Sequence, residues 1–348
     1  MLSDRIEAKW IDAFAEVFER CAVRRGETAA ILSETQSRAL NVHLAELALL
    51  RLGARAFHVV VPTPRNPHPV PVRSTGASEA LGRLGPAVRA LAESGFVADL
   101  TLEGLLHAPE TPEILKGGAR ILMISNEHPE ALERLAPDPA LEPKVKAAVR
   151  MLRAARTMTV RSRAGTDLAV GLDGAATVGV WGTTTRPGTM AHWPGGVVVS
   201  FPGAGKVEGA LVLAPGDVNL TFKRYCESPV RLTIEGDFVT RIDGDGLDAA
   251  LMRRYLAAWG DRNAYAVSHV GWGMNPAARF EALAMYDRRD TNGTELRAVA
   301  GNFLFSTGAN EFAGRYTAGH FDIPVMGCTI SLDGREVVRA GALLDAFG

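Results

Sequence analysis

Apolar residues in the first half of the chain recur at two alternating spacings. Trp10, Phe14, Val17 and Phe18 follow Ile6 at helical intervals and predict a helix over residues 6–25. Short runs rich in Val, Ile and Leu predict strands between further helical segments. We expect strands at 28–33, 55–61, 96–102 and 120–124, and helices at 40–52, 84–94, 110–116, 127–135 and 143–156. Strands separated by helices predict a parallel sheet with helices on both faces.

From about residue 157 the pattern changes, and strands dominate. Strands are expected at 158–162, 167–171, 196–201, 209–213, 230–235 and 238–243, with one helix at 246–259. The sequence therefore predicts an α/β domain over residues 1–156 and a β-rich α+β domain over residues 157–348. Between the second and third predicted strands, residues 62–76 hold five prolines, which exclude regular structure there.

Composition narrows the possible functions. The chain has 348 residues, is 47% hydrophobic and carries a formal net charge of −1, which argues against nucleic-acid binding through a basic field. No apolar run reaches about 18 residues, so no membrane-spanning helix is expected. Three scattered cysteines, Cys21, Cys226 and Cys328, suggest reduced thiols and a cytoplasmic protein. No G-x-G-x-x-G follows the first predicted strand, so no dinucleotide site is predicted.

The strongest chemical signal is His320-Phe321-Asp322, which precedes Ile323 and Pro324. On a strand, the first and third residues point to the same face with Cβ atoms about 6.6 Å apart, close enough for both side chains to bind one cation. Phe321 would then face a core, and Pro324 would end the strand. His269 ends another apolar run before a Gly-x-Gly turn. Two histidines and a carboxylate are the ligands of non-haem Fe(II) oxygenases, although a hydrogen-bonded pair and a core histidine explain the same spacing.

Two further histidines are candidates for proton transfer. His192 begins a His-Trp-Pro-Gly-Gly turn after the polar loop 182–191, which is typical of a lid over a site. His107 follows a predicted strand at its carboxyl end, where open α/β sheets place ligand contacts. Histidine can move a proton near neutral pH, and the alternative for each residue is ordinary packing.

Several segments, taken in order, resemble one known family. They are Val160–Asp167, Leu105-Leu106-His107, His192-Trp193-Pro194, Ser268–Gly273, Gly301–Gly308 and His320–Pro324. Together they resemble the 2,5-dihydroxypyridine 5,6-dioxygenase family, whose members share a fold with the aminopeptidase T-like (M29) metallopeptidases.

The resemblance implies a mononuclear Fe(II) site, with one iron per chain. By matching position, His269, Ser306, His320 and Asp322 would be its protein ligands. His192 would be the acid/base group near the substrate, and His107 its partner in the pocket. The implied reaction is an extradiol-type cleavage in which a hydroxylated pyridine and O₂ give a ring-opened amide acid such as N-formylmaleamate. A role in nicotinate or pyridine degradation and a homo-oligomeric assembly follow from the same resemblance.

The sequence departs from the family in one region. Family members carry an acidic residue about twelve positions before the histidine of the His-Trp-Pro motif, whereas residues 179–186 here include Val180 and no carboxylate. The loop offers Arg186 instead, which could pair with a carboxylate on a different hydroxy-aromatic ring. We also expect Trp193 and Trp272 to contact the substrate.

Two other classes stay open on the sequence alone. M29-like aminopeptidases add two glutamates to the His-x-Asp pair and bind two metal ions, and Glu281 is the one nearby candidate here. A binding protein with a degenerate site is the third possibility, and the presence of His269, His320 and Asp322 argues against it. Metal content separates the first two classes, because the dioxygenase needs one iron and the peptidase two divalent ions.

Overall fold

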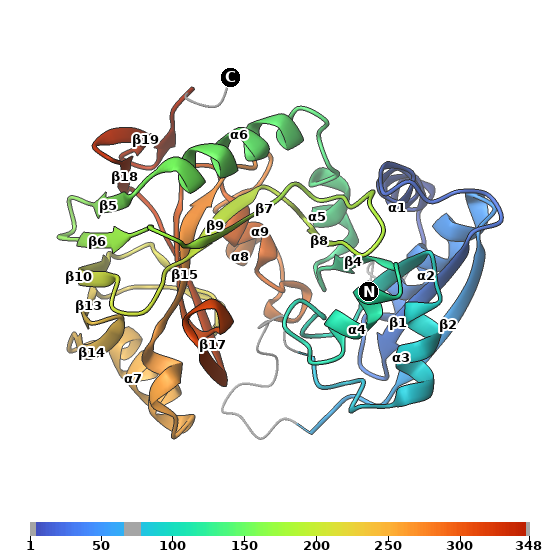
Figure 1. The fold of residues 1–348 in the computed structure, drawn as a ribbon, viewed down its shortest axis with the longest axis horizontal. Helices are drawn as coiled ribbons and strands as arrows, with labels where there is room; N and C mark the ends of the chain where they lie inside the picture. The colour runs from blue at the N-terminus through green and yellow to red at the C-terminus, as the bar shows by residue number, and fades with distance from the viewer. Residues whose placement is uncertain (1–4, 66–77, 346–348) are drawn as a thin grey trace.

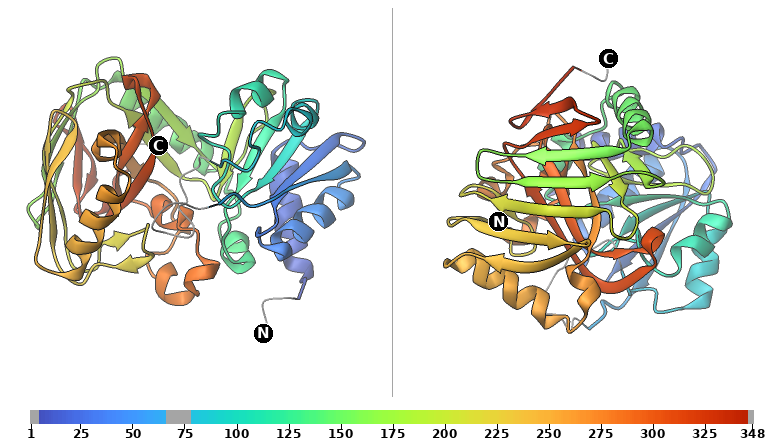
Figure 2. Two further views of the ribbon diagram at one scale, coloured as in Figure 1. Left: turned by 90° about the horizontal axis from the view of Figure 1, so that it is seen from below. Right: turned by 60° about the vertical axis from the view of Figure 1, so that its left-hand side comes forward.

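The computed structural model describes residues 5–65 and 78–345, so most of the proline-rich segment 62–76 lies outside the described residues. The chain forms a region built on a parallel sheet and a larger β-rich region, which lie side by side (Figures 1 and 2). Among the described residues, no helix combines the length and the apolar character needed to cross a membrane.

The first region contains a five-stranded parallel sheet in the order β2-β1-β3-β4-β8. Its strands are β1 (Thr28–Glu34), β2 (Arg55–Val61), β3 (Phe96–Leu100), β4 (Arg120–Ile124) and β8 (Met190–Trp193). Helices α1 (Ala8–Arg20) and α2 (Ala39–Arg51) pack on one face through one apolar cluster, and α3 (Gly85–Ala92) and α4 (Thr111–Lys116) pack on the other face through a second. The predicted parallel sheet with helices on both faces is confirmed.

The edge strand β8 differs from the sequence-based expectation. Residues 190–193 were expected in a lid-like turn, but they pair in parallel with β4, with His192 opposite Met123. A four-residue strand after a polar loop gives too short an apolar pattern to be detected by periodicity. The first sheet is therefore completed by residues 190–193, which lie beyond the predicted domain boundary at residue 157. The division into two domains at residue 157 stays a prediction.

Two antiparallel sheets form the second region. The larger has the order β14-β13-β10-β6-β5-β18-β19-β20, and the smaller has the order β17-β16-β15-β9-β7. The larger sheet contains β5 (Thr157–Arg161), β6 (Asp167–Gly171), β10 (Val207–Leu213), β13 (Val230–Glu235), β14 (Phe238–Asp243), β18 (Thr329–Leu332), β19 (Arg335–Arg339) and β20 (Ala342–Leu343). The smaller contains β7 (Ala176–Val180), β9 (Val197–Phe201), β15 (Val267–Gly273), β16 (Phe303–Asn310) and β17 (Arg315–Val325).

Short elements complete this region. They are α6 (Leu141–Ala154), α7 (Leu247–Ala258), α8 (Ala282–Met285), α9 (Thr294–Ala298), the strand pair β11 (Val218–Asn219) and β12 (Arg224–Tyr225), and single 3₁₀ turns at Arg262–Tyr265, Arg288–Asp290 and Glu311–Ala313. Helix α5 (Pro129–Arg134) instead packs against α1 in the first region, where Leu132 joins the apolar cluster. The six expected strands and the helix over 246–259 are present, while β7, β18 and β19 were not expected because they are short and partly exposed.

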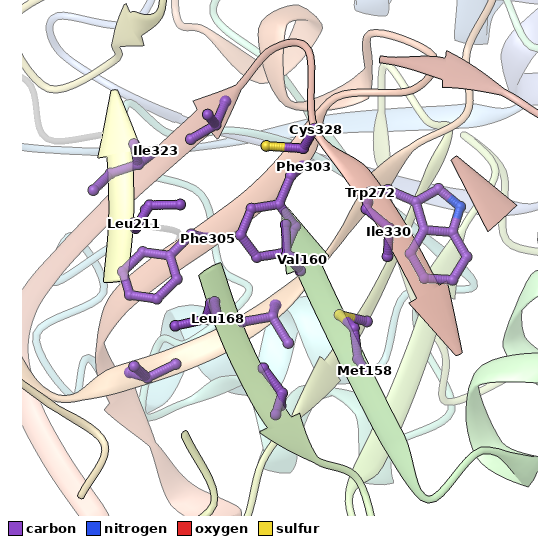
Figure 3. Packing of buried hydrophobic residues seen from close by; sticks show 14 of the residues in the cluster. Met158, Val160, Leu168, Leu211, Trp272, Phe303, Phe305, Ile323, Cys328 and Ile330 are labelled. Atoms are coloured by element: carbon purple, nitrogen blue, oxygen red, sulfur yellow. The ribbon is translucent and has the colours of Figure 1, made fainter. Parts of the chain in front are cut away.

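The main core lies between the two antiparallel sheets. Residues from both sheets meet there, among them Leu168 and Leu211 on one side and Phe303 and Phe305 on the other (Figure 3). Phe321 is 1% exposed within this core, as the sequence predicted. Because side chains alternate along a strand, the neighbours of Phe321 point to the opposite face of the smaller sheet.

Pro324 does not end its strand, contrary to expectation, since β17 continues to Val325. The strand lies at the edge of the smaller sheet, where Pro324 stands opposite Leu304 of β16. A proline lacks a backbone N–H, and an edge strand tolerates this because one side of it has no partner strand.

Candidate metal centre

Adjacent strands bring four of the predicted site residues together. In the β16–β17 pair, Ser306 stands opposite Asp322 and Gly308 stands opposite His320. His320 and Asp322 are two residues apart on one strand, so both side chains point to the face away from the main core. Ser306 therefore lies beside the carboxylate across the strand pair.

A β-bulge in β15 adds the fourth residue. Val267 pairs with Thr307 and Val270 with Phe305, so Ser268 and His269 together stand opposite the single residue Ser306. A bulge of this kind disturbs the alternation of side chains and can redirect one of them. Here it accompanies an imidazole that reaches the face on which Ser306 lies, and no periodicity in the sequence reveals it.

The side-chain atoms converge within a few ångströms. Possible ligand atoms of His269, His320 and Asp322 all lie within 4.8 Å of one another. The Asp322 Oδ1 atom lies 3.1 Å from His320 Nε2 and 3.6 Å from His269 Nε2. The Ser306 hydroxyl lies 3.0 Å from His269 Nε2 and donates a short hydrogen bond to Asp322 Oδ1. Three possible ligand atoms therefore lie close enough together to bind one metal ion, with the Ser306 hydroxyl beside two of them.

A neighbouring hydroxyl fixes which nitrogen of His269 carries the proton. Ser268 Oγ donates to the Ala309 carbonyl oxygen and lies 3.1 Å from His269 Nδ1. Because the serine proton is already donated, Ser268 Oγ accepts a hydrogen bond from Nδ1–H of the imidazole. The Nε2 atom, which faces Ser306 and Asp322, then keeps its lone pair. Hydrogen bonds of this type orient histidine ligands in metal sites.

Arg297, on α9, contacts the other oxygen of the carboxylate. Its Nε donates a short hydrogen bond to Asp322 Oδ2, and the two side chains are 13% and 6% exposed. Burial alone would raise the pKa of Asp322, but the Arg297 guanidinium and His320 outweigh it and hold the pKa well below its usual range. No sequence motif marks Arg297, and its one signal is a lone cation within an apolar stretch.

This donor set fits a divalent metal ion. It offers an ionised carboxylate oxygen, an oriented imidazole lone pair on His269, a second imidazole on His320 and a hydroxyl oxygen. Imidazole and carboxylate ligands suit iron, zinc and other first-row divalent ions. Ser306 is fully buried and contacts both His269 and Asp322. In this position its hydroxyl can bind the metal itself or orient the two neighbouring ligands.

The centre borders a cavity of about 150 Å³. A cavity of this size holds a single six-membered ring. One side is apolar and is formed by Val178, Val180, Val197, Val199, Phe201 and Leu304. Another part is polar and is formed by Ser125, Asn126, Asn292, Thr294 and Arg297. The cavity would therefore accept a flat ring that carries a few polar substituents.

His192 and His107 also line this cavity, as expected of pocket residues. Burial lowers the pKa of His192 to about 4, although its hydrogen bond to Pro194 opposes the shift. His192 Nδ1 lies 2.6 Å from the Pro194 carbonyl oxygen, so Nδ1 carries the proton and Nε2 is left as the acceptor. Burial, followed by the nearby His320, lowers the pKa of His107 to about 4, and the two rings are 5.9 Å apart. Both imidazoles are neutral at pH 7.

The buried neutral state of His192 predicts a loss of stability in acid. The unfolded chain binds a proton at its ordinary pKa near 6.5, whereas the folded chain does so only near 4, so acidification favours unfolding in this interval. Between pH 7 and pH 5 the metal-free protein should lose on the order of 2 kcal/mol through this residue. Urea unfolding at both pH values measures the loss.

Between pH 7 and pH 5, the His192→Gln variant should lose about 2 kcal/mol less of its free energy of unfolding than the wild type does. The exposed His43 provides a matched control, because His43→Gln removes an imidazole that is not buried. An equal loss in His192→Gln and wild type would contradict the neutral, buried imidazole.

Three residues expected to contact the substrate lie elsewhere. Arg186 is exposed and lines a separate cavity beside Thr183–Thr185. Trp193 is fully buried in the core of the first sheet, where its Nε1 donates to the Leu135 carbonyl oxygen at 2.8 Å. Trp272 is fully buried in the core between the antiparallel sheets. The two tryptophans belong to segments that resemble the family, but the alternation of strand residues directs both of them into cores.

Comparisons with known proteins agree with this geometry. The model of the family described as NicX: 2,5-dihydroxypyridine 5,6-dioxygenase matches residues 9–345. A Pseudomonas putida KT2440 protein described as 2,5-dihydroxypyridine 5,6-dioxygenase is 38% identical over 339 residues, which cover 96% of this chain and 95% of the relative.

Solved structures give the same result. The structure of 2,5-dihydroxypyridine dioxygenase from Pseudomonas putida KT2440 has a TM-score of 0.92 and 36% identity, and covers 98% of this chain and 99% of its own. AmpT from Thermus thermophilus has a TM-score of 0.66 at 17% identity, covering 97% of this chain and 99% of its own, and shows a shared fold alone. The chain belongs to the 2,5-dihydroxypyridine 5,6-dioxygenase family.

Proposed function

We propose that this protein is an Fe(II)-dependent dioxygenase that opens the ring of a hydroxylated pyridine, with 2,5-dihydroxypyridine as the first candidate and N-formylmaleamate as its product. Its family supports the reaction class. The observation that carries the proposal is the convergence of His269, His320 and Asp322 beside a ring-sized cavity that a neutral His192 also lines.

The chain's own residues would divide the work as follows. Bound Fe(II) would supply the redox chemistry through which O₂ reacts with the ring. His192 accepts the proton of a substrate hydroxyl at Nε2, because Nδ1 is engaged by Pro194. The valines of β7 and β9, together with Phe201 and Leu304, pack against the ring and exclude water. His107 lines the same space and limits where the ring can lie.

The contact of Arg297 with Asp322 supports one metal ion rather than two. Asp322 Oδ1 faces Ser306 and the two histidines, while Oδ2 faces the guanidinium. A second divalent ion at Oδ2 would have to displace a buried cation or lie against it, and both are unfavourable. Glu281, the candidate for a peptidase-like second site, is exposed and is not among the residues that line the cavity. These contacts disfavour the two-metal peptidase.

The alternative of a carboxylated ring loses its main support. It depended on Arg186, which lies outside the cavity beside the metal centre. Val180 does line that cavity, so the ring would meet an apolar side chain there. The cation at the cavity wall is Arg297, which is already paired with Asp322. A homo-oligomeric assembly and a cytoplasmic location stay predictions.

Oxygen uptake tests the proposal directly. The protein is purified without oxygen, loaded with Fe(II) and mixed with 2,5-dihydroxypyridine in an oxygen electrode. We expect one iron per chain, uptake of one O₂ per ring consumed, and loss of the ring absorbance. One bound iron without uptake would move the substrate to another hydroxypyridine or hydroxybenzoate. Two bound divalent ions, with hydrolysis of an aminoacyl substrate, would overturn the dioxygenase.

A further inference from the structure

The loop that follows β3 forms one wall of the cavity. Thr101, Leu102, Glu103, Gly104, Leu106 and His107 all line it. No hydrogen bond joins the His107 ring to another of the described residues, so its position beside His320 depends on the backbone that carries it.

Two buried carboxylates accept hydrogen bonds from this loop. Asp99, at the end of β3, accepts hydrogen bonds from Thr101 N at 3.0 Å, Thr101 Oγ1 at 2.7 Å and Leu105 N at 2.8 Å. Glu34, at the end of the adjacent strand β1, accepts from Leu102 N at 3.0 Å. Asp99 is 0% exposed and Glu34 is 4% exposed, and neither lines the cavity.

Further backbone contacts fix the same loop at both ends. Gly104 N donates to Thr101 Oγ1 at 3.1 Å, and Ala108 N donates to the Leu105 carbonyl oxygen at 3.0 Å. Gly104 has φ +80° and packs so closely on Met123 that a Cβ atom would meet the Met123 side chain at 1.9 Å. These hydrogen bonds and the left-handed backbone at Gly104 hold the loop between β3 and His107.

Burying these two carboxylates is energetically unfavourable. Among the described residues no salt bridge to either carboxylate is found, and burial, together with the nearby Glu34, raises the pKa of Asp99 to about 6. The Asp99 carboxylate accepts three hydrogen bonds and uses both of its oxygens to do so. An asparagine amide in its place would offer only one acceptor oxygen. The arrangement suits a role that requires this loop in a single position.

We propose that Asp99, supported by Glu34, is a positioning residue that holds the loop of residues 101–107, and with it His107, against the substrate cavity. The proposal rests on the proposed function, because the substrate is what meets this wall. Asp99 acts through the loop and does not itself touch the substrate. Loss of its carboxylate should therefore weaken substrate binding more than it slows the reaction.

Asp99→Asn tests this with Asp217→Asn as a matched control. Asp217 is 3% exposed and also accepts two backbone hydrogen bonds, from Ala214 N and Met326 N at 2.7 Å each, but neither of these donor residues lines the cavity. Both variants lose one carboxylate acceptor in a buried site. A merely structural role would give both the same kinetic effect.

We expect Asp99→Asn to raise KM for 2,5-dihydroxypyridine at least tenfold while kcat falls less than threefold, and Asp217→Asn to leave both within twofold. Hydrogen exchange of the Thr101, Leu102 and Leu105 amides should accelerate at least tenfold in Asp99→Asn alone. Unchanged exchange at these amides, or equal acceleration in Asp217→Asn, would overturn the proposal. If Asp99→Asn does not fold, Glu34→Gln tests the loop through the Leu102 amide.

The exchange experiment needs no turnover, so it separates this proposal from the proposed function. Faster exchange in the loop without any oxygen uptake by the wild type would support the positioning role and contradict the substrate assignment. Normal oxygen uptake by the wild type, with unchanged amide exchange in Asp99→Asn, would support the substrate assignment and contradict the positioning role. Manganese binding, measured by calorimetry, should stay within threefold of wild type in Asp99→Asn because the metal ligands lie on other strands.

Discussion

Replacing His320 by alanine should abolish stable metal binding and lower kcat/KM by at least about a thousandfold. His320 Nε2 lies 3.1 Å from Asp322 Oδ1 and supplies one of two imidazoles in the centre. Removing it leaves one imidazole, one hydroxyl and a carboxylate that already pairs with Arg297. Losing a directly coordinating ligand costs several kcal/mol of metal affinity, and each 1.36 kcal/mol is a factor of ten. Metal analysis after dialysis and oxygen uptake measure both losses.

His58→Ala is the control for this change. His58 lies on β2, is 33% exposed and stands 3.5 Å from Glu46, on the sheet of the first region. His58→Ala also removes an imidazole, but from a position away from the candidate metal centre. Its iron content and its oxygen uptake should therefore match those of the wild type. A His320→Ala protein that folds, keeps one iron per chain and consumes oxygen would show that the metal lies elsewhere.

Replacing His192 by glutamine should lower kcat by about 10²- to 10⁴-fold while one metal ion per chain remains bound. His192 lines the cavity but is not part of the His269, His320 and Asp322 cluster, so the metal does not depend on it. Its neutral imidazole can accept a proton at Nε2, whereas the glutamine amide is a very weak base. Stopped-flow kinetics and metal analysis on the same sample measure the two effects.

The pH dependence of this variant gives a second readout. In wild type, acid should reduce activity only as the pH approaches the low pKa of His192, near 4. In His192→Gln the deficit should shrink at high pH, where the substrate hydroxyl ionises without a base. A deficit that is constant at all pH values would assign His192 a packing role instead of proton transfer.

The candidate site takes its residues from both the antiparallel and the parallel sheet. The antiparallel sheet supplies His269, Ser306, His320 and Asp322 from three adjacent strands, which hold side chains rigidly. The parallel sheet supplies His192 from the end of β8, and the loop after β3 supplies His107, at the carboxyl ends where such sheets bind ligands. The candidate metal centre thus lies on paired strands, whereas one wall of the cavity is the loop after β3, and loops are the parts that most readily change substrate preference.

The sequence by itself determined much of this protein. Alternating helices and strands predicted the parallel sheet, and the spacing of His320 and Asp322 predicted their common face, because both depend on local periodicity. The resemblance carried by short motifs identified the family, which the comparisons confirm.

Only the tertiary structure decided the rest. Arg297 reaches Asp322 across 25 residues, Asp99 and Glu34 meet one loop from separate strands, and a bulge accompanies the turn of His269 toward Ser306. Trp193 and Trp272 enter cores, and Arg186 lies outside the cavity, although motifs suggested otherwise. These outcomes depend on which strands pair and in what register, and neither is encoded in the periodicity of a single segment.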